Sequence, residues 1–159
     1  MCGPERWRLA GAAAALAALL ACAPAAWAVL GEGAASVQAD QQRMGGVRRQ
    51  GTGIGPAVQV IALADGSTIR QYVSGAGVVY AVAWNTHYKP RLDLLLGRYF
   101  PAYVEASARA LQQRPGIVHH AVLRQDDLVV EATAHLTAHV GRAYLRSLLP
   151  AGEPLDAIR

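Results

Sequence analysis

Three β-prone segments with short turns between them constrain the fold of this chain more than any other feature. They cover residues 58–63, 68–73 and 78–84. Asp65-Gly66 in the first turn and the Ser74-Gly75-Ala76-Gly77 run in the second are typical of tight hairpins. The third segment, VVYAVAW, is almost wholly apolar, which indicates a central strand covered on both faces. We therefore predict an antiparallel meander.

Period-2 alternation assigns faces to the second of these strands. Ile69, Gln71 and Val73 should face one way, and Arg70 and Tyr72 the other. This places a charged and an aromatic side chain together on one surface of the sheet.

The middle of the chain predicts a helix in two pieces. Residues 91–99 have an apolar stripe at helical spacing, and a second piece follows at residues 101–113. We expect a break between them because Pro101 has no amide hydrogen and suits the first position of a helix. The second piece should bury one apolar stripe, made of Val104, Ala108 and Leu111.

The remaining segments complete the expected fold. Residues 34–44 predict a short helix ended by Gly45-Gly46, and residues 47–56 predict a loop. Strands are expected at residues 117–123 and 128–134, around the turn that contains Asp126 and Asp127. A further strand is expected at residues 136–145. The prediction is an α+β domain: an antiparallel sheet of five to six strands (a meander plus a C-terminal hairpin) packed against a central broken helix, with a short N-terminal helix.

The first residues have the layout of an export signal. Arg6 and Arg8 precede an apolar run, rich in Ala and Leu, at residues 9–23. Pro24 ends the run, and Ala26-Trp27-Ala28 has the small-x-small pattern that signal peptidase cleaves. We predict a signal peptide at residues 1–28 and a single domain at residues 29–159, exported to the periplasm or secreted.

Two alternatives to cleavage after Ala28 stay open. The uncharged stretch is long enough to cross a bilayer as an uncut anchor, although Pro24 argues against this. Leu19-Leu20-Ala21-Cys22 resembles a lipobox, in which Cys22 becomes a lipidated N-terminus. Sequencing the N-terminus separates these cases, because Val29 supports cleavage and a blocked Cys22 supports lipidation. No membrane span is expected after cleavage.

Composition narrows the partners and the chemistry. The two cysteines, Cys2 and Cys22, both lie in the leader, so the mature domain should have no disulfide and no thiolate ligand. The formal net charge is only +4, and the arginines are scattered apart from Arg48-Arg49. No basic stripe alternates with aromatic residues, so we expect no nucleic-acid partner.

Histidines supply the only candidate catalytic or metal-binding spacing. His135 and His139 form an H-x3-H pair, which shares one face on a helix as in zinc sites. Here the surroundings are β-prone, and residues four apart on a strand lie about 13 Å from each other. A turn between them could shorten that distance. The alternative function is therefore a small periplasmic hydrolase or metal-dependent enzyme that combines these histidines with Asp126, Asp127 or Glu131.

Other chemistry-bearing residues carry weaker signals. The glycine-rich run of residues 51–55 lacks the Lys-Ser/Thr of a phosphate loop, and Ser74 lacks the G-x-S-x-G frame. His119 and His120 should point to opposite faces, and His87 should lie in a surface loop. Core packing explains the aromatic residues Tyr80, Trp84, Tyr99, Phe100 and Tyr103. We assign no catalytic, cofactor-binding or metal-binding residue and expect no cofactor.

Four motifs together resemble a known family. They are GSTIRQYVSGAGVVYAVAW from Gly66, LLGRYFPAYV from Leu95, DLVVEATAH from Asp127 and GRAYLRSLLPAG from Gly141. They are similar to the small exported bacterial proteins of domain-of-unknown-function family 2844, over about residues 30–159. The resemblance implies export and one compact domain, but no activity, substrate or cofactor. The expected function is a non-enzymatic binding or envelope-associated module whose partner is a protein or an envelope ligand.

Overall fold

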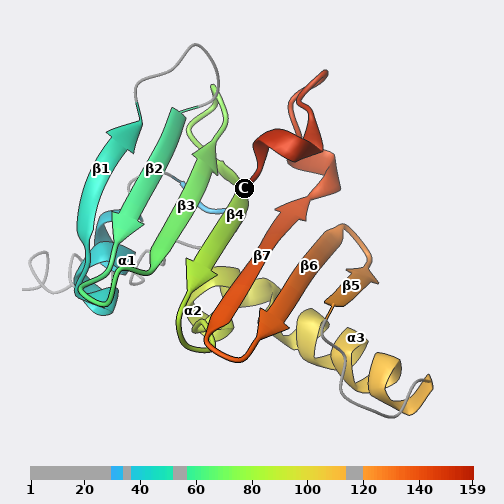
Figure 1. Cartoon of the computed structure of the whole chain (residues 1–159). Helices are drawn as coiled ribbons and strands as arrows, with labels where there is room; N and C mark the ends of the chain where they lie inside the picture. The colour runs from blue at the N-terminus through green and yellow to red at the C-terminus, as the bar shows by residue number, and fades with distance from the viewer. Residues whose placement is uncertain (1–29, 34–36, 52–56, 114–119) are drawn as a thin grey trace, which may run out of the picture.

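Seven strands form one sheet, and the main helices lie on one of its faces (Figure 1). The computed structural model describes residues 30–33, 37–51, 57–113 and 120–159, so the predicted leader, residues 1–28, lies outside the described residues. The strands are β1 (Val47–Gly51), β2 (Ala57–Ala62), β3 (Thr68–Val73), β4 (Val79–Thr86), β5 (His120–Gln125), β6 (Leu128–His135) and β7 (Ala138–Leu145). The helices are α1 (Val37–Met44), α2 (Leu92–Leu96), η2 (Gly97–Tyr99), α3 (Phe100–Gln113), η3 (Arg146–Leu148) and η4 (Leu155–Ala157).

The sheet consists of two antiparallel meanders joined at their inner strands. The strand order is β1-β2-β3-β4-β7-β6-β5, and each neighbouring pair is antiparallel. The α+β class is confirmed, and so is a first meander followed by a C-terminal hairpin. The Asp65-Gly66 turn is also present, with Gly66 in the left-handed region at φ 83°.

The predicted number of five to six strands is wrong, because the sheet has seven. The additional strand is β1, which lies within the expected loop at residues 47–56; residues 52–56 are outside the described residues. Among the strands that the structure describes, β1 pairs only with β2 and forms an edge of the sheet. Val47, Arg48 and Arg49 are all exposed, so this edge strand has no alternation of buried and exposed residues to reveal it.

Strand β4 is the centre of the sheet, as its apolar sequence predicts. Every residue from Val79 to Trp84 is buried. The register between β3 and β4 shifts near one end: Tyr72 lies opposite Ala81 and Val73 opposite Val79, so Tyr80 has no opposite residue. Such a β-bulge redirects side chains. It lets Tyr80 and Ala81 pack in the same cluster.

The helical region packs against one face of the sheet, hereafter the helix face. The cluster of buried residues on this face joins α2 to the inner strands. Its members are Leu30, Ile61, Ile69, Val82, Trp84, Leu92, Leu95, Leu96, Leu128, Val130, Ala143 and Leu145. No helix in the described part of the chain has the length and hydrophobicity to cross a bilayer.

The predicted buried stripe of α3 is wrong. Val104 is 48% exposed and Leu111 is 55% exposed, whereas Ala106 is the buried residue of this helix. Ala102 and Tyr103 pack partly against the helix-face cluster instead. In the view of Figure 1, α3 runs past the end of the sheet beyond β5. The helix therefore meets the sheet through an aromatic and two small side chains, and its longer aliphatic residues have no layer above them.

The opposite face, hereafter the open face, is partly covered by the end of the chain. After β7, residues 149–159 turn back, and the last described residue lies over the middle of the sheet (Figure 1). Leu149 and Ile158 pack with Tyr72, Tyr80 and other residues of a second buried cluster. The tail, expected to be extended or irregular, includes the short helical turn η4.

Candidate functional site

Cross-strand pairing aligns charged residues on the open face. Arg70 on β3 lies opposite Ala83 on β4, and Ala83 lies opposite Arg142 on β7. Arg142 in turn lies opposite Glu131 on β6. Neighbouring strands are about 4.8 Å apart, so Arg70 and Arg142 are about 10 Å apart at the backbone with only a small residue between them.

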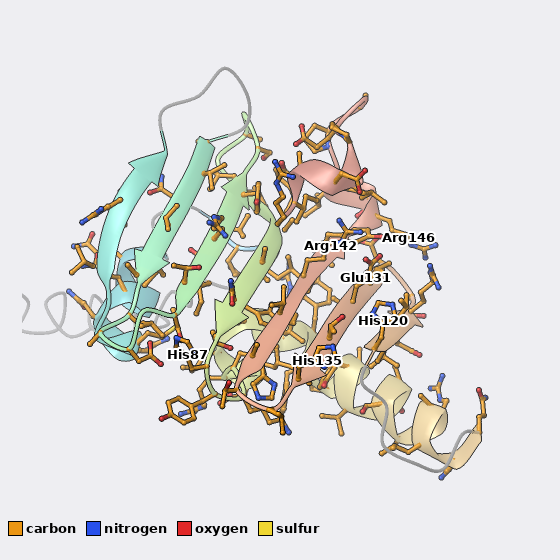
Figure 2. All side chains as sticks on the ribbon, in the orientation of Figure 1. His87, His120, Glu131, His135, Arg142 and Arg146 are labelled. Carbon is orange, nitrogen blue, oxygen red and sulfur yellow. The ribbon has the colours of Figure 1, made fainter. Side chains whose placement is uncertain are left out.

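Arg142 is fully engaged in this structure. Its Nε and Nη2 donate to Glu131 Oε2 at 2.9 and 2.6 Å, and each of the two side chains is 21% exposed. Its Nη1 donates to the carbonyl oxygens of Leu155 and Ile158 in the tail. Figure 2 shows Arg142 and Glu131 next to each other on adjacent strands. The pair neutralises both charges and holds the tail by its backbone.

Tyr72 holds the same tail from the other side. Its hydroxyl lies 3.1 Å from the carbonyl oxygen of Ala157 and 2.9 Å from that of Arg159, and it accepts a bond from the Arg159 amide at 2.9 Å. Between these contacts, Ile158 is 1% exposed and fills the space above the sheet. The tail is therefore fixed by one buried side chain and by backbone hydrogen bonds.

A second tyrosine under the tail has no such role. The hydroxyl of Tyr80 is buried and has no hydrogen-bond partner among the described residues. Burial, with a smaller effect of Glu153, raises the pKa of Tyr80 to about 12. Burial also raises the pKa of Tyr144, to which the charge of Glu131 adds.

A cavity of about 690 Å³ lies on the open face beside the tail. Its lining comes from every strand except β1, and the tail forms one wall. The lining residues are Val58, Arg70, Tyr72, Trp84, Asn85, His120, Glu131, Ala132, Thr133, Val140, Gly141, Arg142, Ala157, Ile158 and Arg159. A cavity of this size with a few polar groups is typical of small-molecule sites.

The polar groups of the cavity are of two kinds. Arg70 is partly buried and forms no hydrogen bond or ion pair within the described part of the chain. The other kind consists of hydrogen-bonding side chains: Asn85 on β4, Thr133 on β6 and His120 on β5, where His120 Nδ1 lies 3.0 Å from Thr133 Oγ1. The one carboxylate side chain of the lining, Glu131, is already paired. The cavity therefore offers a cation and hydrogen-bonding groups, but no unpaired side-chain anion.

The H-x3-H pair does not converge. The β6–β7 turn does lie between the two histidines, but His135 is opposite Ala138 and His139 is opposite Ala134. Because neighbouring positions on a strand alternate faces, the two imidazoles lie on opposite faces of the hairpin. Within the described ranges no three His, Cys, Asp or Glu residues are arranged to hold a metal ion. The geometry required by the metal-dependent alternative is thus not found.

The turn carboxylates have structural partners. Asp127 Oδ1 accepts from the Ser147 amide at 2.8 Å, and Oδ2 accepts from its hydroxyl at 2.5 Å. The Asp126 carbonyl accepts from the Arg146 side chain, and Asp126 has a positive φ of 51°. These contacts tie the β5–β6 turn to η3. Both residues stabilise the turn and lie outside the cavity lining.

The other sequence candidates are placed as follows. His87 is exposed just after β4, and His119 lies outside the described residues. Ser74 Oγ accepts from the Val78 amide within a turn. Trp84, Tyr99, Phe100 and Tyr103 pack on the helix face as expected, but Tyr80 packs on the open face.

The residues that line the cavity were only partly visible in the sequence. The alternation of β3 correctly places Arg70 and Tyr72 on one face. Nothing in the spacing pairs Glu131 with Arg142, because that contact depends on the register of β6 and β7. Once the position of the β6–β7 turn is known, a search for opposite charges at equal distances from that turn finds the pair.

Comparisons with known proteins agree with the resemblance in the sequence. Residues 26–158 match a family described as "Protein of unknown function (DUF2844)". No curated protein and no solved structure matches the chain. The match covers the helical region, all seven strands and nearly all of the tail. The chain therefore belongs to the DUF2844 family.

Proposed function

We propose that this chain is an exported bacterial binding protein that holds a ligand in the open-face cavity. The observation that carries the proposal is the half-buried Arg70 on the wall of the cavity, without a partner among the described residues. A cation taken partly out of water is costly unless an anion or acceptor compensates it. A bound ligand supplies that acceptor.

The tail gives the cavity a defined wall. Ile158 is buried, Arg142 donates to its carbonyl oxygen, and the Tyr72 hydroxyl contacts the carbonyl oxygens of the residues on either side of it. Preformed sites of this kind bind with a smaller entropic cost than flexible ones. Binding here needs no chemistry from His135 and His139, which lie on opposite faces of their hairpin.

Export is supported by the order of residues in the leader. A basic start, an apolar run and the Ala26-Trp27-Ala28 triplet precede the first described residue, Leu30. Leu30 is 1% exposed and packs in the helix-face cluster. A processed chain that begins at Val29 would keep this packed residue.

The export half of the proposal is tested by producing the full chain in a Gram-negative bacterium. The product is recovered from the periplasm, the membranes and the cytosol, and its N-terminus is sequenced. We expect periplasmic protein that begins at Val29. A blocked Cys22 in the membrane fraction establishes the lipoprotein alternative, and unprocessed protein in the cytosol overturns export.

The binding half is tested by native mass spectrometry of that periplasmic product mixed with a water-soluble envelope extract. We expect one saturable small-molecule adduct. Val140→Trp fills the cavity from its exposed position on β7 and should abolish the adduct. Val47→Trp is the matched control, because Val47 is also an exposed valine, on β1, and lies outside the cavity. No adduct, or an adduct that survives Val140→Trp, contradicts the proposal.

A further inference from the structure

We infer that the ligand of this cavity is a carboxylate with an apolar body and that Arg70 binds the carboxylate. The inference rests on the proposed function and adds the class of ligand. The distribution of charge and apolar surface around the cavity supports both parts of this assignment.

The charge comes from Arg70, since Arg142 is occupied. Two nitrogens of Arg142 bind Glu131 and the third binds tail carbonyls, so this guanidinium has little left to offer. Arg70 lies two strands away and has all of its donors available within the described part of the chain. The field in the cavity thus favours an anion.

The guanidinium shape favours a carboxylate among anions of this size. Its planar fork matches the two oxygens of a carboxylate, and such charge-assisted pairs are short and strong. Asn85 and Thr133, further along the cavity, add uncharged hydrogen-bonding groups. No side-chain carboxylate of the lining competes for Arg70, because Glu131 is held by Arg142 at 2.6 Å.

The remaining walls favour an apolar body. Val58, Tyr72 and Ile158 line the cavity near the tail, and Val140 lines it on β7. Val140 is 47% exposed, which is unusual for an aliphatic residue near the middle of a sheet. Tyr72 and Ile158 are already buried under the tail, so the apolar surface open to a ligand is that of Val58 and Val140. A ligand that lays a hydrocarbon surface across these two residues removes them from water, while its carboxylate stays on Arg70.

The test uses three probes that share one hydrocarbon chain: octanoate, octylammonium and 1-octanol. Each is titrated into the processed, isotope-labelled protein, and backbone amide shifts are followed by NMR. We expect octanoate to shift amides on β3, β4 and β7 and to bind at least about fivefold more tightly than octylammonium. Arg70→Gln should remove this preference. Arg48→Gln is the control with the same change in charge, on the edge strand and outside the cavity.

The outcomes separate this inference from the proposed function. If all three probes shift the cavity amides with equal affinity, or if Arg70→Gln leaves the preference unchanged, the site binds ligands but the carboxylate assignment is wrong. If no probe shifts the cavity amides while Val140→Trp abolishes the native adduct, the cavity binds a ligand but that ligand is not an apolar carboxylate. If no probe binds at the cavity and no native adduct is found, both the proposed binding function and the carboxylate assignment are wrong.

Discussion

Tyr72 and Tyr80 lie on neighbouring strands with ring centroids 6.2 Å apart, yet their hydroxyl groups are in opposite situations. The Tyr72 hydroxyl has three contacts with the backbone of the tail. The Tyr80 hydroxyl is buried without a partner among the described residues. A buried polar group stabilises a fold only when it is paired, so the same deletion should have opposite effects at the two positions.

We therefore predict that Tyr72→Phe lowers the free energy of unfolding by about 1–2 kcal/mol, whereas Tyr80→Phe leaves it unchanged or raises it by up to about 1 kcal/mol. Both variants keep the ring and remove one oxygen, so each is the control for the other. Urea denaturation followed by circular dichroism measures the difference. Equal losses in the two variants would show that the Tyr80 hydroxyl has a partner.

The same residue predicts a loss of stability at alkaline pH. Burial raises the pKa of Tyr80 from 10.0 to about 12, so the folded chain retains a proton that the unfolded chain releases. Stability is then fully present below pH 10 and falls as the pH rises from 10 towards 12. In Tyr80→Phe this fall should be smaller. It should not vanish, because burial also raises the pKa of Tyr103 and Tyr144.

Urea midpoints at pH 8, 10 and 11 test this expectation in both proteins. A parallel decline in the original chain and in Tyr80→Phe would assign the effect to the other tyrosines.

At the scale of elements, β4 and β7 join the two meanders at an unusually close contact. Gly141 lies opposite Trp84, and a Cβ atom at Gly141 would stand 2.4 Å from Trp84 Cζ2 and 2.6 Å from the carbonyl oxygen of Glu131. Neither distance is possible for a real side chain. The indole occupies the space above the glycine, and the neighbouring backbone of β6 cannot yield.

Gly141→Ala should therefore lower the free energy of unfolding by at least about 2 kcal/mol through overpacking. Gly75→Ala is the control, because it lies in a turn with nothing within 4 Å of the added carbon, and its effect should stay within about 0.5 kcal/mol. Trp84 is the only tryptophan in residues 29–159, so its fluorescence reports the disturbed contact directly. An unchanged spectrum and stability would refute this packing.

The elements that the sequence predicted are those whose pattern is local. Asp65-Gly66 marks the β2–β3 turn and the apolar run marks β4, because turn chemistry and burial both appear in a few consecutive residues. The edge strand β1 is not marked, since exposed Arg48 and Arg49 obscure it. The prediction of which α3 residues are buried was wrong, because their burial depends on where the helix crosses the sheet.

The cavity was less predictable for a related reason. The turn between β6 and β7 contains Leu136, which has a positive φ of 32° and is fully exposed. Leu is an unusual residue for that conformation, so the sequence does not mark residues 136–137 as the turn between the strands expected at 128–134 and 136–145. Without the turn, the register that brings Glu131 to Arg142 and separates His135 from His139 could not be derived.

At the scale of the whole molecule, the tail closes a face that the helices leave open. The strands β1 to β4 and β5 to β7 are each built from local hairpins, but the tail returns from the far end of the chain to contact both meanders. Arg142 belongs to the second meander and Tyr72 to the first. The tail therefore links the two halves of the sheet in addition to the β4–β7 pairing.

This arrangement makes Ile158 a structural anchor. It is 1% exposed and packs with residues of β3, β4, β6 and β7. We expect Ile158→Ala to lower the free energy of unfolding by about 2 kcal/mol, at the lower end of the range for buried Ile because a chain end can relax into the space. Leu155→Ala, at a residue that is 37% exposed, should change it by no more than about 0.5 kcal/mol.

Hydrogen exchange distinguishes a loosened tail from a general loss of stability. The Arg159 amide bonds to Tyr72 in the folded chain and should exchange faster in Ile158→Ala than in Leu155→Ala. Amides of the edge strand β1, which contributes no residue to the cluster around Ile158, should keep their rates relative to global unfolding. If the Arg159 amide is equally protected from exchange in Ile158→Ala, the backbone hydrogen bonds alone hold the tail. The buried side chain of Ile158 then does not stabilise the cavity wall.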